Sequence, residues 1–331
     1  MMRTIRLISL LLVGVILGIW LAVSLNQSCV GERRWFCLAD PIKTPLPNPA
    51  NEDQSADAEQ YLFTIPPRHV QILMTQGFTR EEIFLVNQAF ERHRDTFAYQ
   101  RFSSQIPLED LYLLALYASA VVGGGFDPRL TVGIHRNEII HQSGVGFTVV
   151  GECAFVSDKK GHTSLVRGAS AEESELVRNR FRREFDAFQV IFENIKAHIH
   201  PGIRKSYLRA SCGAGALGSM QIMPTNWDYY QEEVCREVCA VLGVEYASPF
   251  HLIPAIFGAT ALLRDKARYL GINPSEITIE NHDVIRLIAA AYNAGYRAAS
   301  EPRFLDGYGE NVLRRVQRVA SRLPLGLPKW Y

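Results

Sequence analysis

The sequence predicts a mostly α-helical domain that carries a small β-hairpin insert and follows a single N-terminal transmembrane helix. Three observations predict this architecture. Apolar residues recur at helical spacing along most of the chain after residue 60. Residues 146–166 are instead rich in strand-forming residues around a turn sequence at residues 158–161. Residues 7–25 form an apolar run without any charged residue.

Residues 1–28 are expected to form a membrane anchor. Arg3 and Arg6 precede the uncharged run, which is as long as the roughly 17–25 apolar residues that cross a bilayer. The apolar region of a cleavable signal peptide is usually shorter, about 7–15 residues, so a cleaved signal peptide is the alternative. Residues 26–28 before Cys29 make a poor lipoprotein box, so lipidation is not expected. Because two arginines also follow the run, charge does not fix its orientation.

Residues 29–60 are expected to be a flexible tether, and residues 61–331 the folded domain. Within the tether, residues 38–60 are rich in Pro, Asn, Asp and Ala and have almost no large apolar residue. The whole chain is 47% hydrophobic, enough to bury a core, and its formal net charge is +1. No basic stripe stands out, so a nucleic-acid partner is not expected.

The six cysteines do not have the spacing of a metal site. Cys235 and Cys239 are one helical turn apart, and we interpret this spacing as buried packing more than as a disulfide bond. Cys153 could pair with Cys212 in an oxidising compartment, although the sequence alone does not pair them.

The predicted helices follow from periodicity and from capping residues. One covers residues 80–97, with Thr79 as its N-cap, and a strongly apolar one covers residues 107–122 and ends at three glycines. Another begins after Asp127 with a proline in its first turn. After the β-rich insert, helical patterns cover residues 171–199, a segment that starts at Pro224, and residues 253–270, 283–295 and 309–323. Residues 178–184 are expected to lie on a solvated face.

The segment GALGSMQIMPTNW, residues 215–227, is not typical of a protein core. Its glycines at 215 and 218 allow a ligand or another chain segment to approach the backbone closely. Gln221 between the two methionines offers both a donor and an acceptor. Further along the chain, Tyr292 and Asn293 end an apolar helix within AYNAG. We expect the two segments to line one cleft.

These segments resemble motifs of the lytic transglycosylases of the lysozyme superfamily. The family has a Gly-Ala-(Met/Leu)-Gly-x-Met-Gln-(Ile/Phe)-Met-Pro-(Ser/Thr)-x-Trp block, an Ala-rich helix, an Ala-Tyr-Asn-Ala-Gly block and a closing Tyr-x-x-x-Val element. The matching segments are residues 215–227, 255–264, 291–295 and 308–312, and the resemblance covers about residues 111–319. It implies a lysozyme-like α+β fold and substrate binding by Gly218, Ser219, Met220, Gln221, Tyr292 and Asn293.

The resemblance also implies a reaction that needs one carboxylic acid and neither a metal nor a cofactor. The acid protonates the glycosidic oxygen between N-acetylmuramic acid and N-acetylglucosamine in peptidoglycan. It then acts as the base while the muramic acid's own C6 hydroxyl closes a 1,6-anhydro ring. Because the sugar supplies the nucleophile, the second carboxylate of ordinary glycosidases can be absent. The acid must stay protonated near neutral pH, which an apolar, desolvated site favours.

The first candidate for this acid is Glu138. Residues 198–221 contain no Asp or Glu, so the position that the soluble members of the family use holds no acid here. In the membrane-bound subfamily the acid follows a helix-starting proline by ten residues, as Glu138 follows Pro128. Leu130, Ile134 and Glu138 also share one stripe of the predicted helix.

Glu152 is the alternative acid, because its distance to the glutamine of the block is nearer to that of the membrane-bound subfamily. Against it, residues 146–156 have the composition of a strand. His135 and His141 flank Glu138 at a spacing that would permit a metal, yet no HExxH motif occurs and the family uses no metal. We therefore expect no metal site.

Together, these observations predict a single-pass inner-membrane enzyme whose domain lies in the periplasm, where peptidoglycan is found. A non-catalytic peptidoglycan-binding or scaffold module is one alternative. A hydrolytic muramidase that uses Asp158 or another acid of the hairpin as a second carboxylate is the other. General wall turnover, or opening of the wall for an envelope-spanning secretion or conjugation machine, would fit the predicted activity equally well.

Overall fold

The computed structural model describes residues 63–98, 105–141, 155–157, 163–165 and 216–328, with short helical pieces between residues 183 and 194. Of residues 140, 141, 155–157 and 163–165 only the backbone is described. The chain divides into two units, Met1–Gln60 and Tyr61–Tyr331. The predicted anchor and tether belong to the first unit and lie outside the described residues. Within the described residues, no helix is long and apolar enough to cross a membrane.

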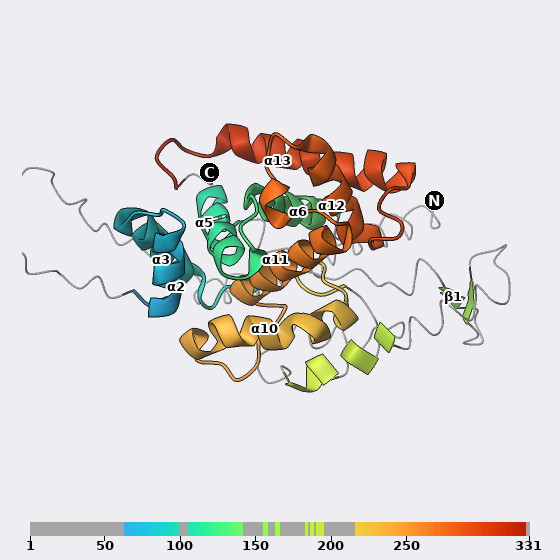
Figure 1. Cartoon of the computed structure of the whole chain (residues 1–331). Coiled ribbons are helices and arrows are strands. Elements are labelled where there is room, and N and C mark those ends of the chain that lie inside the picture. The colour runs from blue at the N-terminus through green and yellow to red at the C-terminus, as the bar shows by residue number, and fades with distance from the viewer. Residues whose placement is uncertain are drawn as a thin grey trace, which may run out of the picture. The chain divides into compact units, whose positions relative to one another are not determined.

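The second unit is mostly α-helical, which confirms the predicted class. Its first half contains α2 (Pro67–Thr75), α3 (Arg80–His93), α5 (Leu108–Ala118), the π-helical η2 (Ser119–Gly123) and α6 (Arg129–His141). Its second half contains α10 (Pro224–Leu242), α11 (Leu252–Tyr269), the 3₁₀ turn η3 (Pro274–Glu276), α12 (His282–Ala294), the π-helical η4 (Arg303–Gly309) and α13 (Glu310–Arg322). Figure 1 shows α11 running through the middle of the helices.

Between the two halves, β1 (Phe155–Ser157) pairs antiparallel with β2 (Thr163–Leu165). Phe155 lies opposite Leu165, and Ser157 lies opposite Thr163. The hairpin predicted around residues 158–161 is therefore confirmed. The turn itself, including Asp158, lies outside the described residues.

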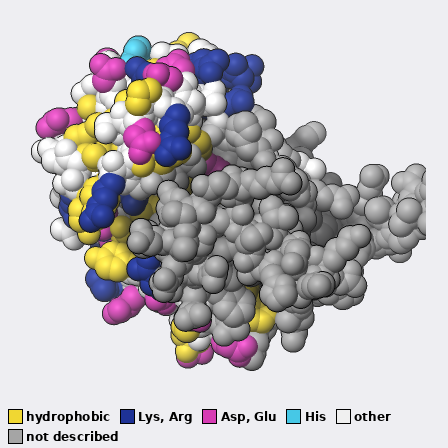
Figure 2. Space-filling model, turned by 90° about the vertical axis from the view of Figure 1, so that its right-hand side faces the viewer, with side chains coloured by type: hydrophobic (Ala, Val, Ile, Leu, Met, Phe, Trp, Pro, Cys, Tyr) yellow, Lys and Arg dark blue, Asp and Glu magenta, His cyan; other side chains and the backbone are white. Residues whose placement is uncertain are grey.

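Helix α11 is central because its sequence is apolar on every side. All residues from Leu252 to Leu263 are buried, and a helix that is apolar all round must be covered by its neighbours. It packs against α5, η2, α10 and α12, and more lightly against α3 and α6. Charged side chains of both signs are interspersed on the surface, as the described part of the face in Figure 2 shows.

Side chains cap the helices where the sequence predicts. The Thr79 hydroxyl accepts a hydrogen bond from the Glu82 amide at 3.2 Å, and the Thr79 amide donates to the Glu82 carboxylate at 2.8 Å. At the start of α6, the Asp127 carboxylate accepts from the Arg129 amide at 2.9 Å. These side chains therefore determine the residues at which α3 and α6 begin.

Two expectations about α10 and its surroundings are wrong. Cys235 and Cys239 form a disulfide bond; four residues apart on one helix, their Cα atoms lie 4.6 Å from each other, within the range that a disulfide spans. Glu184, expected on a solvated face, is buried. Its carboxylate accepts from the Thr225 amide at 2.9 Å and from the Thr225 hydroxyl at 2.8 Å, because the first turn of α10 has amides without helical partners.

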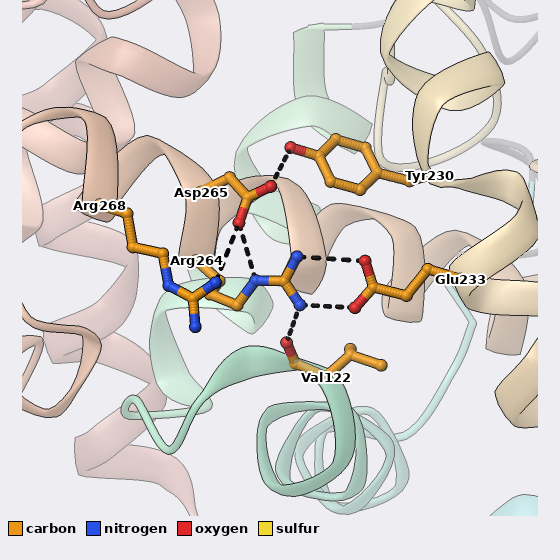
Figure 3. Close-up of polar contacts among 6 residues, drawn as sticks. All are labelled: Val122, Tyr230, Glu233, Arg264, Asp265 and Arg268. Atoms are coloured by element: carbon orange, nitrogen blue, oxygen red, sulfur yellow. Dashed lines mark hydrogen bonds and ion pairs between the residues drawn. The ribbon is translucent and has the colours of Figure 1, made fainter.

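A network of charges centred on Arg264 joins α11 to α10 and η2 (Figure 3). The Arg264 guanidinium donates to both oxygens of Glu233, at 2.5 and 3.1 Å, and to Asp265 at 2.8 Å. It also donates to the carbonyl of Val122 at 2.8 Å. The Tyr230 hydroxyl donates to the second oxygen of Asp265 at 2.9 Å. The charge of Arg264 is therefore compensated on several sides.

Candidate active site

Glu138 lies in the last turn of α6, with its side chain partly exposed. Ile134 and Leu130, one and two turns earlier on the same stripe, are completely buried. The stripe therefore points Glu138 toward the interior of the domain.

The hydrogen-bond partner of the Glu138 carboxyl is Tyr308, whose hydroxyl donates to Oε1. No arginine, lysine or histidine of the described residues forms an ion pair with Glu138. Burial raises the pKa of Glu138 from its ordinary value of 4.5 to about 7, although the hydrogen bond from Tyr308 acts in the lowering direction. A substantial fraction of the carboxyl groups therefore keeps its proton at neutral pH.

Tyr308 lies in the π-helical segment η4, directly before α13. Burial raises the pKa of its hydroxyl well above the ordinary value, and the charge of Glu138 acts in the same direction. Tyr308 therefore remains a hydrogen-bond donor at any physiological pH. The amide of the buried Asn137 lies near enough to the Tyr308 hydroxyl to lower its pKa, although it forms no hydrogen bond of normal geometry with a described residue.

Tyr292 links the segment around Gln221 to the surroundings of Glu138. Its hydroxyl donates to the carbonyl of Met220 at 2.5 Å. It also lies close enough to Glu138 for the carboxylate charge to raise its pKa, although burial is the larger cause. The end of α6, the turn at residues 217–222, the end of α12 and η4 thus converge (Figure 1).

The turn at residues 217–222 is tight and strained. Leu217 and Ile222 pair through two backbone hydrogen bonds, and Gln221 alone among the described non-glycine residues has a positive φ, +50°. Its side-chain amide donates to the Gly218 carbonyl at 2.7 Å, which holds this conformation. At Gly218 a Cβ would lie 2.0 Å from the Pro249 carbonyl oxygen. The close approach expected at this glycine is therefore confirmed, and it is made by another segment of the chain.

The other predicted binding residues differ in exposure. Ser219 is completely buried, and its hydroxyl has no hydrogen-bond partner among the described residues. The Met220 side chain is also buried, so its carbonyl is the group that Tyr292 contacts. Gln221 is half-buried, and Asn293 is exposed at the end of α12.

Glu152, the alternative acid, lies outside the described residues, and so does the side chain of His141. His135 is completely buried, and neither ring nitrogen has a hydrogen-bond partner among the described residues. Burial lowers its pKa to about 3, so the ring is neutral at physiological pH. The described residues contain no group of three or more metal-ligating side chains.

Sequence reasoning did not place Tyr308 or Asn137 among the site residues. Tyr308 was noticed only within the Tyr-x-x-x-Val element, and its contact with Glu138 spans 170 residues of sequence. No local pattern identifies such a contact. Asn137 differs, because it directly precedes the candidate acid in the sequence, and this adjacency is a signal for a site residue.

The assembled groups can carry out general acid–base chemistry. Glu138 can give and take a proton near pH 7, and Tyr308 can orient the carboxyl in both states. Comparisons with protein family models, with curated proteins and with solved structures found no match.

Proposed function

We propose that this chain is a lytic transglycosylase that cleaves the β-1,4 bond between N-acetylmuramic acid and N-acetylglucosamine in peptidoglycan. The observation that carries the proposal is the environment of Glu138. Its carboxyl has a pKa of about 7, contacts Tyr308, and lies near the backbone segment that Tyr292 holds. A general acid works best when its pKa is near the working pH.

In the proposed reaction, protonated Glu138 gives its proton to the glycosidic oxygen, and the bond from C1 of N-acetylmuramic acid to that oxygen breaks. The N-acetylglucosamine unit leaves with a free 4-hydroxyl. The C6 hydroxyl of the same muramic acid then bonds to C1, and its proton returns to the Glu138 carboxylate. The acid is regenerated, and no water is consumed. The Tyr308 hydroxyl stabilises the carboxylate that exists between the two transfers.

Substrate positioning is assigned to the turn at residues 217–222 and to the end of α12. The Ser219 hydroxyl lacks a partner among the described residues, and because it is completely buried, a glycan hydroxyl or acetamido group can reach it only when the covering segments move aside. Gln221 is held in a conformation with positive φ, and such backbone strain is concentrated at functional sites. Tyr292 keeps this turn next to Glu138. Gly218, Met220 and Asn293 complete the proposed glycan contacts.

The proposal extends to the finer fold and to the location of the protein. Helices around a buried central helix, with one small hairpin, are compatible with a lysozyme-like α+β domain. The uncharged run at residues 7–25 supports a single anchor in the inner membrane. Peptidoglycan as substrate then requires the domain to be periplasmic.

The test is product analysis. The full chain, purified in a non-ionic detergent, is incubated with peptidoglycan sacculi, and the released fragments are analysed by mass spectrometry. We expect 1,6-anhydro-muramic acid ends, which disappear with the Glu138→Gln variant. Reducing ends would instead identify a hydrolytic muramidase. Binding without cleavage would identify a non-catalytic module and contradict the proposal.

A further inference from the structure

A cavity lies between α6, α13 and the start of α5. Its volume is about 240 Å³, and it is lined by Leu108, Arg136, Arg315, Arg318, Val319 and Arg322. Four of these six side chains are arginines, and none is acidic. This differs from the mixed charges of the surface in Figure 2.

We propose that this cavity binds a phosphate group of a soluble compound or of a lipid headgroup. The proposal does not depend on the peptidoglycan-cleaving activity proposed above.

The arginines converge because α13 packs closely on α6. At the crossing, a Cβ on Gly133 would lie 2.6 Å from a methyl group of Val316, so only glycine permits this approach. The arginines of α13 follow one another at three- and four-residue steps, which places them on one face of the helix. On the α6 side, the half-buried Arg136 donates to the carbonyl of Ile106 at 2.8 Å, which fixes its guanidinium at the cavity.

The positive charge of the cavity is not compensated within the described part of the chain. No described acidic residue forms an ion pair with any of the four arginines. The neighbouring Arg314, which does not line the cavity, contacts Asn311 at 2.6 Å and Glu310 at 3.9 Å. Burial, followed by the charges of Arg318 and Arg314, lowers the pKa of Arg315, and burial lowers that of Arg136. Their surroundings therefore destabilise the charged forms of Arg315 and Arg136, and a bound anion would stabilise them.

The charge and the number of donors favour phosphate over carboxylate. Each guanidinium offers five N–H donors in a planar fork. A phosphate monoester carries about −1.5 to −2 charges and three strong acceptor oxygens, whereas a carboxylate has one charge and two oxygens. Arginine also binds phosphate with two parallel hydrogen bonds. The cavity holds about eight times the ~30 Å³ that a water molecule occupies in the liquid, which leaves room for one or two phosphate groups.

Calorimetric titration with inorganic pyrophosphate tests the site. The full chain in non-ionic detergent micelles should bind it in a saturable manner at low salt. The Arg315→Gln/Arg318→Gln variant should bind about tenfold more weakly or worse, because it loses two charge-assisted contacts. Arg314→Gln controls for loss of positive charge on the same helix, because it removes one arginine that does not line the cavity. Its affinity should stay within about twofold of the unmodified chain.

The source of the phosphate is tested in the same micelles doped with phosphatidic acid, a lipid phosphate monoester, or with phosphatidylcholine. Displacement of pyrophosphate by phosphatidic acid alone identifies a lipid headgroup, and no displacement identifies a soluble phosphate compound. Thermal melting should show that both variants are folded, because the double variant removes repelling charges and Arg314→Gln removes only exposed contacts with Asn311 and Glu310. Absence of saturable binding, tighter binding of citrate than of pyrophosphate, or equal losses in both variants would each overturn the proposal.

Discussion

Glu138 and Arg264 are both ionisable groups removed from most of the solvent, yet their surroundings differ. Arg264 contacts two carboxylates and a backbone carbonyl. Glu138 has a hydrogen bond from one tyrosine and no cationic partner among the described residues. Buried charges in proteins are normally paired, because an unpaired charge loses its hydration without compensation. The paired group serves the fold, and the unpaired one is available for chemistry.

The pKa values show the same contrast. Burial lowers the pKa of Arg264, but the hydrogen bonds and charges of Glu233 and Asp265 outweigh it, so its pKa is raised and the cation is stable. Burial raises the pKa of Glu138, and the single hydrogen bond from Tyr308 offsets this only in part. A shift toward neutral pH without a counter-ion is typical of catalytic acids, whereas a compensated shift is typical of structural ion pairs.

The largest expected effect comes from removing the chemical group. Glu138→Gln keeps the size of the side chain and its hydrogen-bonding ability, but it has no transferable proton. Cleavage of sacculi, followed as loss of turbidity, should fall by about 10²–10⁴-fold. Thermal melting should show a folded protein, and co-sedimentation with sacculi should show that it still binds peptidoglycan. The control is Glu152→Gln, which should retain more activity. Loss of activity in that variant alone would mean that Glu152 is the acid.

The second largest effect is expected from removing the ion pairs of Arg264. Arg264→Met keeps the apolar stem but leaves Glu233 and Asp265 without their main partner. We expect the free energy of unfolding to fall by about 2–4 kcal/mol, slightly less than for a completely buried pair. Urea denaturation measures this. Arg268→Met is the control, because that exposed arginine lies 3.7 Å from Asp265 and should contribute less than about 1 kcal/mol. Similar losses in both variants would contradict a structural role specific to Arg264.

The starts of α3, α6 and α10 were predictable from local sequence signals. Thr79, Asp127 and Pro224 mark helix starts that the structure confirms, because capping and proline geometry act within a few residues. The position of Glu138 on the buried stripe of α6 also followed from helical periodicity. The contact of Glu138 with Tyr308 did not, because it depends on how α6 and η4 pack 170 residues apart.

The disulfide shows a different limit of sequence reasoning. The spacing of Cys235 and Cys239 fits both packing and bonding, since both need side chains on one face of the helix. Spacing alone therefore could not separate the two outcomes. Glu184 was misassigned for a related reason, because a charged run identifies a helix face but not the one member that caps another helix. In the arginine cavity, the sequence places three arginines on one face of α13, but it does not predict the approach of Arg136 from α6.

A third effect tests whether Glu138 is costly to ionise in the folded protein. Its pKa is about 7 when folded and near 4.5 when unfolded. Between these values the folded state holds a proton that the unfolded state has released, so stability falls as pH rises from about 4.5 to 7. The total change should be roughly 1–3 kcal/mol. The free energy of unfolding of Glu138→Gln, measured by urea denaturation across this range, should lack this component. Parallel curves for the two proteins would contradict the raised pKa.

The smallest effect concerns the single partner that Glu138 has. The hydrogen bond from Tyr308 lowers the pKa of Glu138, so Tyr308→Phe should raise this pKa further, by about one unit. Because the acid must be protonated to act, activity falls as pH rises through this pKa, and in the variant the fall should occur at higher pH.

Tyr292→Phe provides the matched control for this shift. It removes the hydrogen bond to the Met220 carbonyl but leaves the one between Tyr308 and Glu138, so it should lower the rate without moving the alkaline limb of the pH profile. Rates of sacculus cleavage over a range of pH, with melting curves as a check on folding, measure both variants. An unchanged limb in Tyr308→Phe would mean that burial alone sets the pKa of Glu138. Tyr308 would then contribute only to the orientation of the carboxyl, and a lower rate at every pH would be its sole effect.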